Sequence, residues 1–231
     1  MRSGTCGRTF RCTFRRQTWY PFHVKINVVL FQPEIPQNTG NISRTCSVTG
    51  SALHLVHPVG FSLDERHLRR AGLDYWDTLE IFEYPDDEAF FRAHGDRRIW
   101  FFSQKGRLSI WQDDALTPDI PGSQAPDSGF VGFREPGAPR ELGESRALGA
   151  PGETREPAQP EVWLAFGCES RGLDEKLLLQ HDDTCVRIPM LDGKRSLNLS
   201  NAVAIAVYEV LRRYGGEGLK ARGVLPGRAD A

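Results

Sequence analysis

From Lys25 onward, short apolar segments alternate with segments that carry helix signals. The apolar segments are rich in Val, Ile, Leu and Phe and have the length of buried strands. Strands that alternate with helices predict an α/β domain with a mostly parallel sheet. The predicted strands are 26–31, 52–58, 78–84, 97–103, 161–167 and 184–190, and the predicted helices are 40–49, 68–71, 86–93, one from Asp174 and one over 200–214.

Residues with capping preferences mark the ends of several predicted helices. Asp64, Asp86 and Asp174 are of a type that caps helix N-termini, because the carboxylate accepts hydrogen bonds from the first backbone N–H groups. Gly50 and Gly72 follow predicted helices and suit the left-handed conformation that commonly ends a helix.

The 231 residues are most simply one domain over 25–216, with an N-terminal extension and a C-terminal tail over 217–231. Residues 1–24 hold five arginines and no acidic residue, and they lack the apolar stretch of a signal peptide. We expect them to form a basic, disordered extension; an organellar transit peptide is the alternative.

A segment over 118–160 interrupts the alternation of strands and helices. It holds eight of the fifteen prolines and seven glycines, with few large apolar residues. This composition buries too little apolar surface to offset the entropy of ordering the chain. We therefore expect a solvated insertion that is dispensable for folding.

Charge and cysteine content restrict the classes of partner and site. The formal net charge is −1, so binding to a polyanion would depend on local patches. No apolar run reaches the roughly 18 residues of a membrane span, and we expect no membrane partner. The five cysteines are odd in number and form no CxxC pair, so we expect neither a disulfide framework nor a metal site, and a reducing, cytoplasmic location.

Common catalytic patterns are incomplete in this chain. Gly167–Gly172 has the glycine spacing of a phosphate-binding Walker A loop, but the two residues that follow are not its Lys and Ser/Thr. Cys168 lies on a strand-to-loop turn without a nucleophile elbow or an assigned histidine base, so we interpret it as a buried residue. His54 and His57, on a predicted strand, are interpreted as structural.

Four loops at predicted strand ends carry polar, turn-prone residues. In open α/β sheets, ligands bind beyond the carboxyl ends of the strands, where such loops meet. Ser196, Asn198 and Ser200 are either helix caps or part of a ligand site. In the second interpretation they join the turns "FSQKG" and "FGCESRGL" to form three adjacent loops, whose backbone groups hydrogen-bond an adenine and a ribose.

Four motifs in this order, "PEIPQNTGNISR", "HLRRAGLDYW", "FGCESRGL" and "IPMLDGKRSLNLSNAVAIAVYEV", closely resemble the SPOUT superfamily of RNA methyltransferases. Within it, the resemblance is to the TrmL-type tRNA (cytidine/uridine-34) 2′-O-methyltransferases. It covers residues 26 to about 215, apart from the insertion. It implies a parallel sheet with helices on both faces, whose C-terminal part forms a deep trefoil knot. The chain departs from the family at Cys168, where proline or another small residue is expected.

The resemblance also implies a cofactor, S-adenosyl-L-methionine, held mostly by backbone groups of three loops in the knot. The matching motif positions assign Phe102, Gly167, Ile188 and Ser196 to cofactor binding. Gly167 is expected to let the ligand approach the backbone closely.

The substrate that the resemblance implies is tRNA, contacted at the anticodon stem-loop and methylated on the ribose 2′-OH of the wobble nucleotide. A homodimer is implied, in which the partner completes each site. Asn38, Glu169 and Asn198 are assigned to RNA binding or to support of the site. The alternatives are methylation of another tRNA or rRNA site, and a non-catalytic RNA-binding protein of the same fold.

Arg44 is the candidate catalytic residue. Pro33 and Pro36 stiffen the exit from the first strand, and Asn38 is expected to accept a hydrogen bond at the helix start. Free backbone amides there suit an RNA phosphate. Because a guanidinium stays protonated in proteins, Arg44 is expected to stabilise alkoxide charge or to position a phosphate rather than to act as a base.

Overall fold

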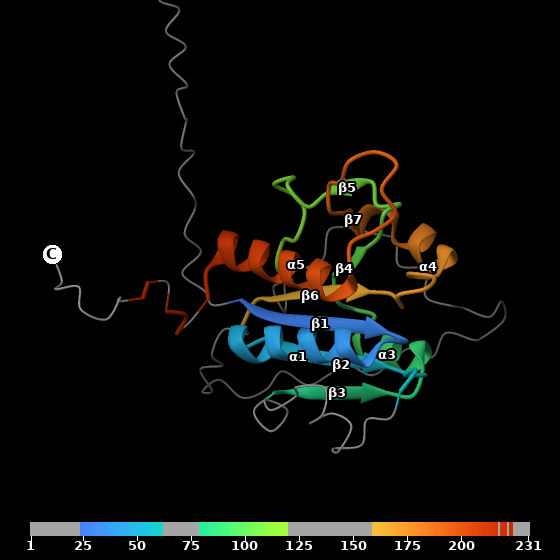
Figure 1. The fold of residues 1–231 in the computed structure, drawn as a ribbon, viewed down its shortest axis with the longest axis horizontal. Helices are drawn as coiled ribbons and strands as arrows, with labels where there is room; N and C mark the ends of the chain where they lie inside the picture. Colours follow the sequence, from blue (N-terminus) through green and yellow to red (C-terminus); the bar gives the residue numbers. More distant parts are fainter. Residues whose placement is uncertain (1–23, 62–78, 120–158, 217, 221, 224–231) are drawn as a thin grey trace, which may run out of the picture.

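The computed structural model describes residues 24–61, 79–119, 159–216, 218–220 and 222–223. Several predictions fall outside these residues: the extension before Val24, the helix over 68–71 with its cap Asp64, nearly all of the insertion, and most of the tail. In the described parts the chain forms one sheet with helices packed on it (Figure 1).

Seven strands form the sheet, in the order β3-β2-β1-β6-β4-β7-β5, and every neighbouring pair is parallel. The prediction of a parallel α/β sheet is confirmed. The buried strands β1 and β6 lie at the centre and pair from Lys25 with Glu161 to Leu30 with Phe166. The strands are β1 Lys25–Phe31, β2 Ala52–Val56, β3 Ile81–Tyr84, β4 Ile99–Phe102, β5 Leu108–Ser109, β6 Glu161–Phe166 and β7 Cys185–Arg187.

The helices are α1 Pro36–Thr49, α3 Asp87–His94, α4 Glu175–Gln180 and α5 Leu199–Tyr214, with a short 3-10 helix, η2, over Asp182–Thr184. The predicted caps are confirmed at Asp86, which accepts from the Ala89 amide at 2.7 Å, and at Asp174, which accepts from the Lys176 amide at 2.8 Å. Gly50 ends α1 in the left-handed conformation, as predicted.

The start of α1 differs from the prediction. The helix begins at Pro36 rather than near residue 40, because proline is well suited to the first helical position. The N-cap residue is Ile35, whose side chain makes no capping bond. Asn38 lies within the first turn, so it is not the cap of the helix, although its side chain does accept a hydrogen bond there, from Asn198.

Helices cover both faces of the sheet, as the resemblance implied (Figure 1). On one face, α1 and α5 pack side by side through residues such as Ile42 and Val207. On the other face, α3 and α4 contribute Phe90 and Leu178 to a second core that includes Phe31. The two cores meet only across the strands, so the carboxyl edge of the central strands is left between four helices.

The ends of the insertion lie next to each other. Asp119 and Glu161 form an antiparallel bridge through two backbone hydrogen bonds, of 2.6 and 2.9 Å. This bridge therefore holds the two ends of the insertion together, while its dispensability for folding stays a prediction.

Candidate active site

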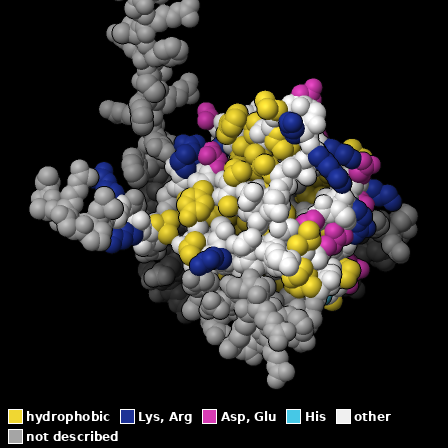
Figure 2. Space-filling view, in the orientation of Figure 1, with side chains coloured by type: hydrophobic (Ala, Val, Ile, Leu, Met, Phe, Trp, Pro, Cys, Tyr) yellow, Lys and Arg dark blue, Asp and Glu magenta, His cyan; other side chains and the backbone are white. Residues whose placement is uncertain are grey.

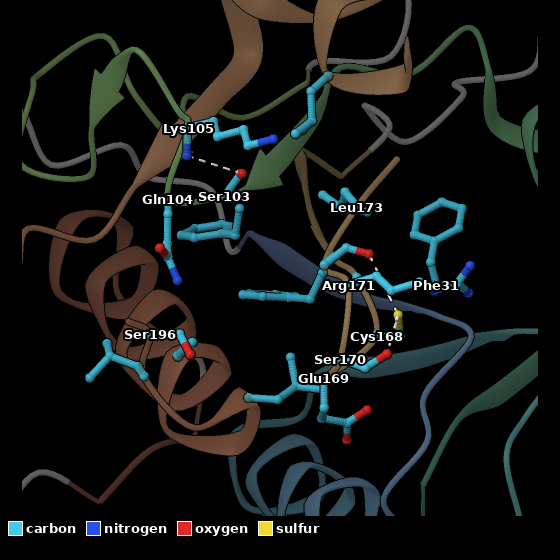
Figure 3. Close-up of a pocket in the computed structure, with 18 of the residues that line it drawn as sticks. Phe31, Ser103, Gln104, Lys105, Cys168, Glu169, Ser170, Arg171, Leu173 and Ser196 are labelled. Atoms are coloured by element: carbon cyan, nitrogen blue, oxygen red, sulfur yellow. Dashed lines mark hydrogen bonds between the residues drawn. The ribbon is translucent and has the colours of Figure 1, made fainter. Parts of the chain in front are cut away.

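A cavity of about 1000 Å³ lies at the carboxyl ends of β1, β4, β6 and β7 (Figure 3). It is lined by the loops that follow these strands, which is where the sequence predicted a site. Seven of the eight predicted site residues line it: Phe102, Gly167, Ile188, Ser196, Asn38, Glu169 and Asn198. The eighth, Arg44, does not.

The loop after β4 lies directly on β7. The Ser103 amide donates to the Val186 carbonyl at 3.0 Å. A Cβ atom at Gly106 would stand 2.5 Å from the carbonyl carbon of Val186, so only glycine fits here. This contact brings the "FSQKG" loop to the loop that follows β7, and both then face the cavity.

The loop after β6 folds tightly onto itself. A Cβ atom at Gly167 would lie 2.1 Å from the carbonyl carbon of Gly172 and 2.2 Å from the Leu173 nitrogen. The chain itself therefore requires a glycine at 167, and close approach of a ligand to this position stays a prediction. Gly172 turns the loop with φ of 74° and has open space around it.

A chain of hydrogen bonds at the cavity wall joins the start of α5, the first turn of α1 and the loop after β6. Asn198 Nδ2 donates to Asn38 Oδ1 at 2.9 Å, and Asn38 Nδ2 donates to Glu169 Oε1 at 2.9 Å. The Oδ1 atom of Asn198 also caps α5 by accepting from the Ser200 amide at 2.9 Å. Of the two roles predicted for Asn38, Glu169 and Asn198, the geometry favours support of the site, because these polar groups already bind one another.

The carboxylate of Glu169 also takes the place of a side-chain cap before α1. It accepts from the backbone N–H of Glu34 at 2.8 Å and of Ile35 at 3.3 Å. The backbone amides of Glu34 and Ile35, just before the helix, therefore already donate to a carboxylate of the chain. A phosphate site at the helix start stays a prediction.

Glu34 in turn accepts hydrogen bonds from the loop that carries Glu169, a role that the sequence analysis did not identify. Its carboxylate accepts from the Ser170 hydroxyl at 2.7 Å and from the Ser170 amide at 3.0 Å. The hydrogen bond from the Ser170 hydroxyl is the main cause that lowers the pKa of Glu34. Glu34 stands inside the quoted motif "PEIPQNTG", but its partner is 136 positions away, so no local signal could identify this role.

Arg44 lies on the solvent-facing side of α1. Gln37, Asn41 and Val48 are exposed on the same side of the helix, whereas Ile42 and Cys46 are buried. In its own chain, Arg44 is therefore placed outside the cavity whose chemistry it was predicted to assist.

The described cysteines and histidines take structural places. The Cys168 sulfur lies 3.8 Å from the Ser170 hydroxyl and 3.7 Å from the Gly172 carbonyl, and no histidine among the described residues lines the cavity. His54 is buried between aromatic rings and contacts Tyr84 at 3.0 Å, and burial lowers its pKa to about 3. His57 forms an exposed pair with Glu83. Both histidines fit the structural interpretation.

The charges around the cavity are mixed. Figure 2 shows Lys and Arg side chains next to Asp and Glu side chains on the part of this face that lies over α4. The charged residues that line the cavity are Lys105, Arg171, Arg187 and Arg195 together with Asp87, Glu169, Asp174 and Glu175. A ligand with both donors and acceptors suits such a lining better than a bare polyanion does.

Two features are absent from the described residues. No group of three or more of their His, Cys, Asp or Glu side chains could hold a metal ion. None of their helices is long and apolar enough to cross a bilayer.

Comparison with known proteins identifies relatives over most of the chain. The SpoU rRNA Methylase family matches residues 25–123 and 141–208. A tRNA (cytidine(34)-2′-O)-methyltransferase of Saccharophagus degradans is 36% identical over 200 residues, which cover 84% of this chain and 99% of that protein.

Solved structures share the fold. One, described as "Structural insights into the 2-OH methylation of C/U34 on tRNA", is 32% identical, with a TM-score of 0.60 over 82% of this chain and 96% of that one. A more distant one is an AdoMet-bound rRNA methyltransferase from Sinorhizobium meliloti, at 20% identity and a TM-score of 0.56 over 84% of this chain and 58% of that one. At that identity, the second likeness concerns the fold alone.

Proposed function

Because this chain belongs to the SpoU rRNA Methylase family, we infer that it methylates the ribose 2′-hydroxyl of nucleotide 34, a cytidine or uridine, in tRNA. One observation in this structure supports the same function for this chain as for its relatives. The cavity brings together three loops that are far apart in the sequence, and seven of the eight residues expected at the site line it.

The methyl donor in this proposal is S-adenosyl-L-methionine, and the cavity fits it. Phe102 and Phe166 stack with ring centroids 4.6 Å apart, and Ile188 packs against the same core. Ser196 and the backbone of the surrounding loops add hydrogen-bonding groups to this apolar wall. Such a combination suits an adenine and a ribose. When bound, the cofactor supplies a methyl group on a positively charged sulfonium.

The remaining chemistry falls to residues that position the 2′-hydroxyl. A hydroxyl is a weak nucleophile until it loses its proton, so the site must align it with the methyl group and stabilise negative charge on the oxygen. Arg44 is proposed for the second task, together with holding an adjacent phosphate. Its guanidinium cannot accept a proton, which passes instead to a phosphate oxygen or to water.

A homodimer is part of the proposal, because Arg44 lies outside the cavity of its own chain. Exposed apolar side chains on α1 and α5 support it: Val48 is 53%, Ile205 41% and Tyr208 56% exposed. Figure 2 shows apolar side chains gathered over α5. In this proposal, two such surfaces pack together and Arg44 of one protomer acts in the cavity of the partner.

Mixing two inactive variants tests this arrangement. Arg44→Ala removes the proposed catalytic group, and Ser196→Tyr fills the cavity at an exposed position. If Arg44 acts in the partner's cavity, co-expressed and re-purified heterodimers regain activity, because one site then has both an open cavity and Arg44. If it acts within its own chain, no site is complete and the mixture stays inactive.

The proposal also includes the trefoil knot in the C-terminal part. Two observations support it. Strand β7 pairs with β4 on one side and β5 on the other, although both precede it in the chain. The "FSQKG" loop crosses onto the backbone at Val186, next to the segment that leads to α5.

A cytoplasmic location is proposed as well. Cys46, Cys168 and Cys185 are free thiols, which suits a reducing compartment. Imaging of a C-terminal fluorescent fusion, with and without residues 1–24, tests the alternative that the basic segment directs the protein to an organelle.

Methyl transfer from labelled S-adenosyl-L-methionine to total tRNA tests the function directly, and mass spectrometry of digested tRNA locates the product. We expect a 2′-O-methyl group at nucleotide 34. A product at another tRNA position or only on rRNA would overturn the substrate assignment. Binding of tRNA without any transfer would overturn the enzyme assignment.

A further inference from the structure

The cavity continues past the cofactor loops to the opposite face of the sheet. Phe102, Phe166 and Ile188 belong to the core under α1 and α5, whereas Phe31 and Leu173 belong to the core under α3 and α4, and all five line the cavity. In Figure 3, Phe31, Arg171 and Leu173 lie on one side, and Ser103, Gln104 and Ser196 lie on the other. We call the part of this one cavity that is lined by Phe31, Arg171 and Leu173 the second lobe.

Three polar side chains meet in this second lobe. Arg171 Nη2 donates to Gln32 Oε1 at 2.9 Å, and the Gln32 side chain lies close to the carboxyl group of Asp87, whose pKa it acts to lower. Gln32 has a φ of 51°, a left-handed conformation that is uncommon for a residue other than glycine and that clusters at functional sites. The three residues come from the end of β1, the loop after β6 and the start of α3.

Asp87 has an unused acceptor. Its Oδ1 atom is buried and has no hydrogen-bond partner among the described residues. An unsatisfied carboxylate oxygen inside a cavity wall is unfavourable unless a ligand supplies a donor. The exposed side chain of Arg171 hydrogen-bonds to Gln32, and all three residues line the cavity.

The residues that line the second lobe limit the kinds of ligand that can bind there. A phosphate is disfavoured, because Asp86 and Asp174 add negative charge beside Asp87. Phe31, Leu173 and Leu177 provide apolar wall, which suits the flat body of a base. A nucleobase that carries an amino group satisfies both the apolar wall and the unpaired oxygen.

We propose that this lobe receives the base of the nucleotide being methylated, and that Asp87 accepts a hydrogen bond from the exocyclic amino group of cytosine. The inference rests on the proposed function and adds a residue that distinguishes its two target bases. Cytosine presents an N4 amino donor, whereas uracil presents an O4 acceptor at the same place. An ionised carboxylate only accepts, so it favours cytosine; a protonated one donates to O4.

The protonation of Asp87 therefore sets the preference. Burial is the main cause that raises the pKa of Asp87, and Asp86 on its own helix and Asp174 at the start of α4 raise it further, whereas the Gln32 side chain lowers it. Arg171 is the cation that lines the same lobe. Cytidine preference is expected to be strong at high pH and to weaken as the pH falls.

Two anticodon stem-loop RNAs that differ only in C34 or U34 test the proposal. Wild-type kcat/KM is expected to favour C34 about tenfold at pH 8, and the ratio is expected to fall as the pH is lowered through the acidic range in which the enzyme stays folded. Asp87→Asn offers both a donor and an acceptor, so its ratio is expected near one and independent of pH. Its affinity for S-adenosyl-L-methionine is expected to match the wild type.

Asp86→Asn is the matched control, because it removes the neighbouring charge and keeps a residue that caps α3. It is expected to retain the C34 preference. An unchanged ratio in Asp87→Asn, or a wild-type ratio near one at every pH, would overturn the base-reading role. The wild-type pH series decides the question even if Asp87→Asn does not fold. Failure of the wild type to methylate either RNA would instead overturn the proposed function.

Discussion

Glu169 and Asn38, which are 131 positions apart in the sequence, are joined by a 2.9 Å hydrogen bond from Asn38 Nδ2 to Glu169 Oε1. Asn38 is buried, and the same carboxylate holds two backbone amides that precede α1. The loop that lines the proposed cofactor site thus fixes the start of the helix that carries Arg44.

Removing this carboxylate should destabilise the protein. Glu169→Ala leaves a buried amide and two backbone N–H groups without their acceptor, so we expect a loss of about 1–3 kcal/mol in the free energy of unfolding. Glu169→Gln, which keeps one acceptor oxygen, should lose less. Urea denaturation measures both. Glu88→Ala, which removes an exposed carboxylate paired only with Arg92, is the control and should change stability by less than about 0.5 kcal/mol.

Gly167 and Gly172 should respond differently to alanine. Gly167→Ala forces a Cβ atom into the peptide between Gly172 and Leu173, so we expect distortion of the loop, a large drop in melting temperature and loss of cofactor binding in calorimetry. Gly172→Ala meets open space and only the strain of a positive φ, which costs about 1–2 kcal/mol. Equal effects of the two substitutions would contradict the geometry of this loop.

Arg44→Ala should lower the methylation rate far more than cofactor affinity. Loss of a group that stabilises developing charge commonly reduces the rate by about 10²–10³-fold. Arg44→Lys should recover little if the planar guanidinium must span two acceptors. Single-turnover rates at saturating tRNA measure this effect. A defect that appears only in tRNA affinity, and that lysine repairs, would reduce Arg44 to an RNA-binding residue.

His54 should make stability depend on pH. Burial and the nearby charges of His94 and Lys25 lower its pKa to about 3 in the folded state, against about 6.5 in the unfolded chain. Its contribution is therefore fully present above pH 6.5 and is lost as the pH falls towards 3, because the unfolded chain binds the proton first. Between pH 7 and 5 we expect a loss of about 2 kcal/mol from this residue.

Chemical denaturation over this pH range measures the His54 effect. His54→Gln should reduce the slope of stability against pH, although the lowered pKa values of His94 and His181 leave part of it. A slope that His54→Gln does not alter would show that His54 is not the responsible group.

Replacing 120–158 with a short Gly/Ser linker should change the free energy of unfolding by less than about 2 kcal/mol. The cost of closing a loop changes by only about 0.6 kcal/mol for each doubling of its length. The hydrogen bonds between Asp119 and Glu161 already hold the two ends together. Thermal unfolding of the shortened protein provides the measurement, and a fall of more than about 10 °C would show that the segment packs on the domain.

Local signals in the sequence predict much of the fold. The apolar run before Phe31 predicts a buried strand, Asp86 and Asp174 predict helix starts, and Gly50 predicts a helix end, because each acts on its own neighbours. Strand β5 was missed because its two residues show no periodicity. The start of α1 was misplaced because no side-chain cap on the preceding residue, Ile35, marks the turn that begins at Pro36.

In the candidate site, too, features with a local sequence signal were predicted, and features that depend on distant residues were missed. Motif positions predicted residues that line the cavity, because the residues of each motif lie close together along the chain. The second lobe was missed because Gln32, Asp87 and Arg171 come from three separate segments and none is unusual in its own context. The close backbone contact that requires Gly167 was also hidden, since the backbone that it meets is set by the fold of the loop.

The central place of β6 has a consequence for biosynthesis. Residues 161–166 leave the ribosome after more than two thirds of the chain has been made, yet β1 and β4 can join one sheet only through them. Until then, the nascent chain presents two apolar strands with unpaired edges, the kind of surface on which chains aggregate. Chaperone binding is therefore expected to matter most for nascent chains that end before Glu161 and to decline once β6 has emerged.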